Sequence, residues 1–277
     1  NRGNSGGPMF NIDGDVVGVN SAIYSPSGGS VGIGFAIPSS TVQPIIAQLR
    51  AHGQIRRGWL GVQIQPVTDE IAESLGLENT DGALVADVVE NGPAAKANIK
   101  AGDIILTFNG TKVSEMRMLP RLVAQAPVDA AANVGLLRRG KRQSLDVKIE
   151  ELQDKTQLAL NGKMDGGDAE SPGEGQQHSA ELGMTLSSIT GSLRQRFNLA
   201  TEASGLVVTD VDADGAAIEK GIRAGDIIVE VGQEKITSPK QFAAKIEDAK
   251  KHHQKTVLLL LDNEQGQRYV ALKIKSA

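Results

Sequence analysis

The start of the chain combines short apolar runs that predict strands with one stretch of helical spacing. The runs are Val16–Val19 and Gly32–Ile37, and Asp13-Gly14 ahead of the first run is typical of a hairpin turn. Over residues 42–49 the apolar positions follow a helical period, and we expect Ser39 or Ser40 to cap this helix. Because so few strands leave unpaired edges, we expect further strands upstream of this sequence.

The remaining sequence contains an internal repeat, since three short blocks recur in one order at an offset of about 120 residues. The paired blocks are Leu60-Gly61-Val62 and Leu182-Gly183-Met184, Gly82–Val85 and Gly205–Val208, and Ala101–Ile105 and Ala224–Ile228. In each copy the apolar pattern predicts strands that alternate with short helices, one longer helix and two closing strands. We place the first repeat at 58–152 and the second repeat at 179–277, each a mixed α/β unit.

The segment between the repeats, residues 153–178, has almost no apolar side chains between Asn161 and Gln177. Such a composition cannot bury enough surface to offset the entropy of ordering the chain. We therefore predict a flexible linker here. Near the end of the second repeat, Ser238-Pro239 predicts the start of its longer helix, with serine as the cap and proline in the first turn.

Composition and charge narrow the possible functions. The 277 residues include no cysteine, which excludes disulfides and thiolate zinc sites. A net charge of −4 disfavours electrostatic binding of nucleic acid, and the short basic run Arg138–Arg142 is interpreted as a solvated loop or strand end. No apolar run reaches the length of about 18 residues that a transmembrane helix needs. No metal-ligand spacing or phosphate-binding loop is present, so we expect no metal and no cofactor.

The segment Gly3-Asn4-Ser5-Gly6-Gly7-Pro8 carries the clearest candidate chemistry. A serine that attacks a carbonyl needs an exposed hydroxyl on a tight turn and backbone N–H groups that hold the developing oxyanion. Glycines on both sides permit that turn. The segment also fits the Gly-x-Ser-x-Gly elbow, but strands rather than a helix follow it, which argues against that context. A plain surface glycine turn is the alternative interpretation.

These motifs, in this order, resemble the HtrA (Do-like) serine proteases. The resemblance rests on Asn1–Pro8, Gly32–Pro38 and the two Leu-Gly/Gly-Asp repeats, and it covers essentially the whole chain. The family comprises bacterial envelope proteases that join a chymotrypsin-like double β-barrel to one or two PDZ domains. The resemblance implies a mainly β fold with helices, in which residues 1–53 end a trypsin-like protease domain and each repeat is a PDZ domain.

The resemblance also assigns roles to residues near the start of the chain. Ser5 matches the nucleophile, and the backbone of Gly3, Asn4 and Ser5 matches the oxyanion hole. Ile23 and Ile33 match the walls of the S1 pocket, which implies cleavage after small aliphatic residues.

A catalytic triad also needs a base and a carboxylate that orients it, and in this family both lie upstream of the serine. The four histidines of this chain have no such context, and we interpret them as solvent-facing: His52, His178, His252 and His253. We therefore expect the chain by itself to be inactive as a protease.

The PDZ interpretation gives the repeated Leu-Gly block a function. Backbone N–H groups of Leu60, Gly61 and Val62 can form a nest for a terminal carboxylate, and Arg57 adds positive charge nearby. The incoming peptide would pair with strand 62–65. Leu122 and Val123 on the facing helix would line the pocket, although ordinary core positions are the alternative interpretation for both.

The second repeat carries Leu182-Gly183-Met184 with no arginine beside it, so we expect weaker ligand capture there and more subunit contacts. The Gly-Asp pairs at 102–103 and 225–226 are interpreted as structural turns rather than sites.

Two classes of function remain. The resemblance implies a periplasmic endoprotease of protein quality control and the stress response that degrades unfolded or misfolded envelope proteins. It also implies PDZ domains that bind C-termini or apolar segments, a chaperone activity, and assembly as trimers or their multiples. The alternative is a non-catalytic tandem PDZ scaffold that binds peptides.

Overall fold

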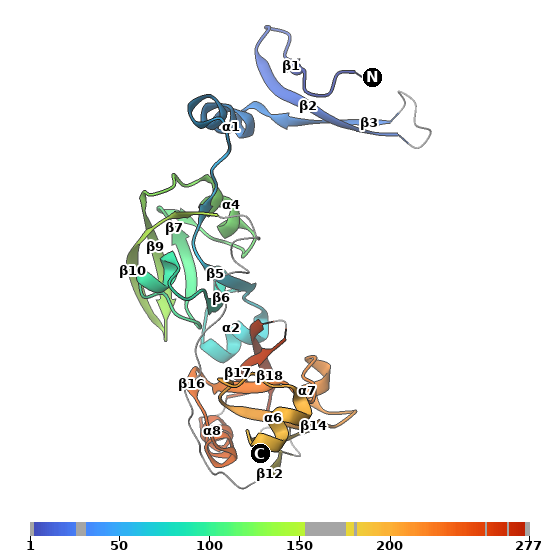
Figure 1. Cartoon of the computed structure of the whole chain (residues 1–277), viewed down its shortest axis with the longest axis vertical. Coiled ribbons are helices and arrows are strands. Elements are labelled where there is room, and N and C mark those ends of the chain that lie inside the picture. Colours follow the sequence, from blue (N-terminus) through green and yellow to red (C-terminus); the bar gives the residue numbers. More distant parts are fainter. Residues whose placement is uncertain are drawn as a thin grey trace. The chain divides into compact units, whose positions relative to one another are not determined.

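The computed structural model describes residues 3–25, 32–152, 176–179, 182–252, 254–264 and 266–274. The chain divides into two compact units, Asn1–Arg56 and Arg57–Ala277, which we call the N-terminal and C-terminal units. Figure 1 shows the first in blue and the second from blue-green through green and yellow to red. Most of the predicted linker, residues 153–175, lies outside the described residues.

The N-terminal unit is a three-stranded antiparallel sheet followed by a helix. Its strands β1 (Pro8–Phe10), β2 (Val16–Tyr24) and β3 (Ile33–Pro38) pair in sequence order, and helix α1 spans Ser39–His52. The predicted hairpin turn forms between β1 and β2, where the Asn11 side chain accepts hydrogen bonds from two backbone N–H groups of the turn. The predicted serine cap of α1 is wrong, because Pro38 occupies the cap position and no side chain bonds the first turn.

The described part of the N-terminal unit buries only Gly18. Its large apolar side chains are exposed: Met9, Phe10, Ile12, Val16, Val17, Ile23, Tyr24, Ile33, Phe35, Ile37, Ile46, Leu49 and Ile55. Exposed apolar surface on this scale is unfavourable in water and is typical of a surface that packs against another part of a protein. This unit therefore has the character of part of a larger β-domain.

The first repeat is a five-stranded antiparallel sheet with two short edge pairs. Its sheet order is β10-β9-β7-β6-β5, with β8 on β7, while β11 pairs with β4. The elements are β4 (Gly58–Trp59), β5 (Val62–Pro66), α2 (Asp69–Leu75), β6 (Ala83–Val88), α3 (Pro93–Lys96), β7 (Ile104–Phe108), β8 (Thr111–Lys112), α4 (Met118–Gln125), β9 (Ala131–Arg138), β10 (Lys141–Lys148) and β11 (Glu150–Glu151). Helix α4 and the sheet enclose a core that includes Phe108, Leu119 and Leu136.

The second repeat has the same order of elements, with one strand added at the edge. Its sheet order is β12-β13-β14-β15-β17-β18, with β16 on β15. The elements are β12 (Gln176–Ser179), β13 (Met184–Ser188), α6 (Gly191–Phe197), β14 (Leu206–Val211), α7 (Ala216–Glu219), β15 (Ile227–Val231), β16 (Glu234–Lys235), α8 (Pro239–Lys251), β17 (Thr256–Asn263) and β18 (Gly266–Lys273). Ser238 caps α8 through the Gln241 N–H, as predicted.

Strand β12 corrects the predicted extent of the linker. Residues 176–178 were expected to be flexible, but they belong to β12, which pairs antiparallel with β13 from Gln176 opposite Ser187 to Ser179 opposite Met184. A strand at this position satisfies the backbone groups along the edge of β13, which would otherwise stay unpaired. The linker therefore ends before Gln176.

A shared apolar cluster joins the two repeats into the C-terminal unit. Its buried members are Val67, Ile71, Ala72, Leu84 and Ile104 of the first repeat, and Leu258, Leu260, Tyr269 and Ala271 of the second. The side-chain amide of Gln65 on β5 also bonds the backbone of Tyr269 twice, accepting from its N–H at 2.7 Å and donating to its oxygen at 3.0 Å. Because one core spans both repeats, we expect them to unfold together.

At the margin of this cluster, a half-buried ion pair joins Glu70 to Lys220 at 3.0 Å. The hydrogen bond from Lys220 lowers the pKa of Glu70 from 4.5 to about 2. A carboxylate with a lowered pKa stabilises the folded state above its ordinary pKa, and this contribution is lost as the pH falls towards the folded value. The contribution of this pair to the free energy of unfolding is therefore present above about pH 5 and is lost as the pH falls to about 2. We expect Glu70→Gln to remove this pH-dependent contribution, measured by urea unfolding at several pH values.

Glu73→Gln, on the exposed part of the same helix, is the matched control. Glu73→Gln should leave the contribution of the Glu70–Lys220 pair in place. Added salt should weaken that contribution, because the pair is partly accessible to solvent. An identical acid limb of the stability profile in Glu70→Gln and in the unsubstituted chain would contradict the assignment.

Candidate catalytic serine and peptide-binding turns

Ser5 lies exposed on a tight glycine turn that is fastened to β2. The N–H of Gly7 donates to the Asn4 oxygen at 3.0 Å and closes the turn around the serine. The N–H of Gly6 donates to the Asn20 oxygen at 2.8 Å, and the Asn20 N–H donates to the Gly7 oxygen at 2.9 Å. Gly6 has φ +85°, a conformation that favours glycine. The motif therefore presents an accessible hydroxyl on a defined backbone turn.

The described residues do not bring a histidine to Ser5. His52 ends α1 and is exposed, and His252 is exposed at the end of α8. The side chains of His178 and His253 lie outside the described residues.

The positions assigned to the S1 pocket lie on the β2–β3 ribbon. Ile23 faces Gly34 across the ribbon, and Ile33 faces Tyr24. Facing residues share one side of an antiparallel pair, and neighbours along a strand alternate sides, so Ile23 and Ile33 project from opposite sides. Their exposed fractions are 39% and 62%. The described ribbon therefore does not bring the two side chains into one pocket, and the S1 assignment stays a prediction for the larger domain.

Two hydrogen bonds to its carbonyl groups fix the Leu-Gly turn of the first repeat. The oxygen of Leu60 accepts from the Ala94 N–H and the oxygen of Gly61 accepts from the Val89 N–H, both at 2.9 Å. Gly61 has φ +77°. The fold uses these two carbonyl groups, and the nest of N–H groups at Leu60, Gly61 and Val62 stays a prediction.

The second repeat builds its turn with the same bonds. The oxygen of Leu182 accepts from the Ala217 N–H at 3.1 Å, and the oxygen of Gly183 accepts from the Asp212 N–H at 2.9 Å. Gly183 has φ +67°, and Met184 begins β13 as Val62 begins β5. The repeated block therefore encodes a repeated turn geometry, beyond a similarity of sequence.

The strand edges beside the two turns differ. β5 is the last strand of its sheet, so its outer edge can accept an added strand, whereas β12 already lies on the equivalent edge of β13. An extended peptide that binds the second repeat in this mode would have to displace β12. This arrangement supports the expectation of weaker capture there, which stays a prediction.

The two helix positions assigned to the peptide groove differ in burial. Val123 is 6% exposed and belongs to the core, whereas Leu122 is half-buried on α4. In the second repeat the residue at the position of Leu122 is Lys245, which pairs with Glu234 at 2.6 Å and lowers the pKa of that carboxyl. Arg57 is exposed, so its side chain is accessible to a ligand. This helix position is therefore apolar in the first repeat and charged in the second.

The first repeat contains a buried ion pair that was not predicted from the sequence. Asp103 is 1% exposed, and Arg138 donates to its two oxygens through Nε at 2.7 Å and a terminal nitrogen at 2.6 Å. The interpretation of Arg138 as solvated is wrong, since its side chain is 19% exposed and also bonds the Asn98 oxygen. The Asp103 carboxylate also accepts from the Lys100 N–H, so the Gly-Asp pair is a structural turn, as expected.

The fold and these sites define a class of protein: the end of a trypsin-like domain followed by two PDZ domains. Family models described as PDZ domain match residues 58–149 and 207–260, and a model described as Trypsin matches residues 1–46. None of the described helices is long and apolar enough to cross a membrane.

Comparison with curated proteins identifies the family. Proteins named probable periplasmic serine endoprotease DegP-like match 99% of this chain, with 41% identity in Bartonella henselae and 43% in Brucella suis. The match covers 51% and 50% of those proteins, so the chain spans about half the length of the curated relatives it matches. The chain is homologous to the HtrA-type, DegP-like serine endoproteases, which confirms the family expected from the sequence.

Two solved structures are similar to part of the chain. The HtrA-type protease AlgW with decapeptide is 40% identical, with a TM-score of 0.47 over 56% of this chain and 47% of the other. The serine endoprotease from Yersinia pestis is 31% identical, with a TM-score of 0.40 over 55% of this chain and 49% of the other.

Proposed function

We propose that this chain works within a periplasmic serine endoprotease that degrades unfolded or misfolded envelope proteins. The observation that carries the proposal is Ser5, exposed on a glycine turn that is held by two backbone hydrogen bonds to Asn20 of β2 and by one within the turn. Ser5 is the nucleophile, and the backbone of Gly3, Asn4 and Ser5 forms the oxyanion hole when the rest of the protease domain is present. The exposed apolar side of the N-terminal unit supports this, because such a domain supplies the surface that covers it.

The first repeat captures the substrate in this proposal. A C-terminal carboxylate binds the N–H groups of the Leu60-Gly61-Val62 turn, the peptide extends the sheet at the edge of β5, and Leu122 contacts its apolar end. Arg57 adds charge beside the turn. Unfolded chains expose both C-termini and apolar segments, so this groove selects them over folded proteins. Chaperone activity and assembly as trimers or their multiples are part of the same proposal.

A second candidate, a non-catalytic tandem PDZ scaffold, is favoured by one observation. No described histidine bonds Ser5, and activation of a serine nucleophile requires a base within hydrogen-bond reach. The 277-residue chain by itself should therefore be inactive as a protease. The two candidates differ in whether the full-length protein supplies the base.

Covalent labelling of Ser5 distinguishes the candidates. In the full-length protein that contains this chain, a fluorophosphonate probe should label Ser5, because an activated serine forms a stable phosphonyl ester. The same probe should not label the 277-residue chain, and Ser5→Ala is the control in both. Peptide mapping would locate the label. If the full-length protein stays unlabelled while peptides with a free C-terminus still bind to it, the protease function is excluded and the scaffold function remains.

A further inference from the structure

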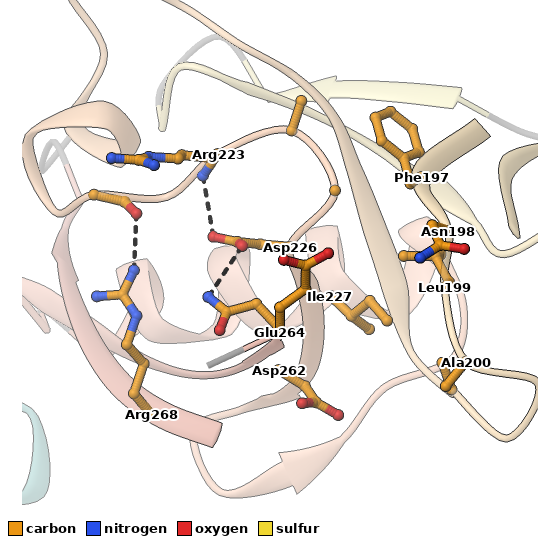
Figure 2. Close-up of a pocket in the computed structure, with 15 residues that line it drawn as sticks. Phe197, Asn198, Leu199, Ala200, Arg223, Asp226, Ile227, Asp262, Glu264 and Arg268 are labelled. Atoms are coloured by element: carbon orange, nitrogen blue, oxygen red, sulfur yellow. Dashed lines mark hydrogen bonds between the residues drawn. The ribbon is translucent and has the colours of Figure 1, made fainter. Parts of the chain in front are cut away.

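A cavity of about 720 Å³ opens in the second repeat, away from the Leu-Gly turn. Figure 2 shows its lining, with Asp226 at the centre, Asp262 and Glu264 beside it, and Phe197 on the opposite wall. Leu199 and Ile227 add apolar surface to the lining. The cavity thus combines three carboxylates with an apolar wall, and neither the proposed catalytic turn nor the peptide-binding turn contributes to it.

The first repeat provides an internal comparison for this cavity. Ile104 pairs with Leu137 in the first repeat, and its counterpart Ile227 pairs with Asp262 in the second. The strand ends therefore correspond residue by residue: Leu137, Arg138 and Arg139 in the first repeat match Asp262, Asn263 and Glu264 in the second. The apolar and basic segment of one copy is thus replaced by an acidic and polar segment in the other.

This replacement leaves a buried carboxylate without the cation that its counterpart has. Asp226 is 7% exposed and accepts from the Arg223 N–H at 3.0 Å, as Asp103 accepts from its own turn. The guanidinium that Arg138 gives to Asp103 is replaced by the Asn263 amide, which donates at 3.2 Å. A neutral amide balances the charge of a buried carboxylate less well than a bidentate guanidinium does.

The arginines that line the cavity do not fill this role among the described residues. Figure 2 shows the Arg223 side chain directed away from Asp226, with only its backbone N–H on the carboxylate. Arg268 donates its terminal nitrogens to the oxygens of Lys220 and Gly221. Burial, together with the charge of Asp87, raises the pKa of Asp262, so a nearby cation would stabilise its ionised form.

We propose that this cavity binds an arginine side chain of a polypeptide partner, whose guanidinium displaces the Asn263 amide and bonds Asp226 as Arg138 bonds Asp103. Asp262 and Glu264 attract the cation, and the apolar wall covers the methylene stem of the side chain. The Phe197 ring already receives a guanidinium, since Arg196 lies 5.1 Å from its centroid. A planar fork fits two carboxylate oxygens as an ammonium does not, which favours arginine over lysine.

A blocked peptide tests this inference without engaging the carboxylate-binding turns. The full 277-residue chain is titrated with acetyl-Gly-Arg-Gly-amide and followed by NMR at the backbone amides of Gly225 and Asn263. We expect saturable shifts at both, and at least tenfold weaker binding when citrulline or lysine replaces the arginine, because the bidentate charged bond is lost. Equal affinity for the three peptides would overturn the proposal.

Two substitutions taken from the first repeat sharpen the test. Asn263→Arg supplies a guanidinium from within the chain, and Asp262→Leu removes one of the attracting carboxylates. Each should weaken binding of the arginine peptide at least tenfold, and Asp262→Leu decides the matter if Asn263→Arg does not fold. Glu247→Gln, exposed on α8, is the matched control because it changes the net charge by the same amount as either substitution, and it should leave binding unchanged. Binding that survives Asn263→Arg and Asp262→Leu in folded protein would refute the assignment.

Since the site shares no residue with the Ser5 turn or with either Leu-Gly turn, failure of this test leaves the proposed protease function untouched.

Discussion

Replacing Arg138 by methionine lowers the free energy of unfolding of the C-terminal unit by about 3–5 kcal/mol, because it strands a buried carboxylate. Asp103 is 1% exposed, and both of its oxygens receive hydrogen bonds from Arg138. Methionine keeps much of the stem but removes the cation, so the loss reports the charge rather than a cavity. Urea unfolding followed by the fluorescence of Trp59, the single tryptophan of the chain, measures the change in the first repeat.

Two further variants separate this effect from general damage to the fold. Asn263→Ala, at the equivalent position of the second repeat, should cost only about 1 kcal/mol because it removes one bond from a neutral donor. The double variant Asp103→Leu/Arg138→Met should recover much of the loss, since no buried charge remains unpaired. A loss in Arg138→Met no larger than in Asn263→Ala would show that the pair contributes little to stability.

Local patterns determined much of the fold, so the sequence predicted it well. The short helices predicted in each repeat are present, and the caps follow the chemistry of their residues, with Thr68 on α2 and Ser238 on α8. The exception is α1, where Pro38 fixes the backbone at the cap position and leaves the serines inside the helix. The repeated Leu-Gly and Gly-Asp blocks became the repeated turns because glycines with positive φ and a side-chain carboxylate define each turn locally.

The packing of one repeat on the other was missed, although β17 carried a signal for it. An antiparallel strand with one buried face alternates apolar and polar residues, as β9 does in burial. The run Val257–Leu261 is instead apolar at every position and buried throughout. Its alternate residues divide between two cores: Leu259 packs within the second repeat, whereas Leu258 and Leu260 join the cluster shared with the first. Such a run predicts a strand covered on both faces.

The candidate sites also differ in whether the sequence could reveal them. The Ser5 turn and the Leu-Gly turns are contiguous in sequence, so a motif can identify them. The Asp103–Arg138 pair and the cavity at Asp226 join residues far apart in the chain, and their register decides which residues meet. An alignment of the two repeats at their strand ends would have revealed the exchange of Arg138 for Asn263, because that exchange removes a positive charge at a half-buried position.

We expect Gly61→Ala to weaken the binding of a peptide with a free, apolar C-terminus by about 10- to 100-fold. At φ +77° an alanine is strained by about 1–2 kcal/mol. Its Cβ would also lie 3.2 Å from Pro93 Cδ and 3.3 Å from the Trp59 ring. Pro93 and Trp59, or the turn itself, must give by a few tenths of an ångström. We expect the turn to shift and its N–H groups to move away from the carboxylate they would bind. Trp59 borders this turn, so its fluorescence can follow the titration.

Gly76→Ala is the matched control because it imposes the same kind of strain elsewhere in the first repeat. Gly76 has φ +65° at the end of α2, and a Cβ there meets nothing within 4 Å. This variant should lose some stability and keep its affinity for the peptide. Amidation of the peptide should reproduce the effect of Gly61→Ala on the unsubstituted chain, since it removes the charge that the turn holds. Gly183→Ala should leave the titration unchanged, because β12 occupies the corresponding edge of the second repeat. If the amidated and free peptides bound Gly61→Ala and the unsubstituted chain equally, the Leu60-Gly61-Val62 turn would not be the site of carboxylate capture.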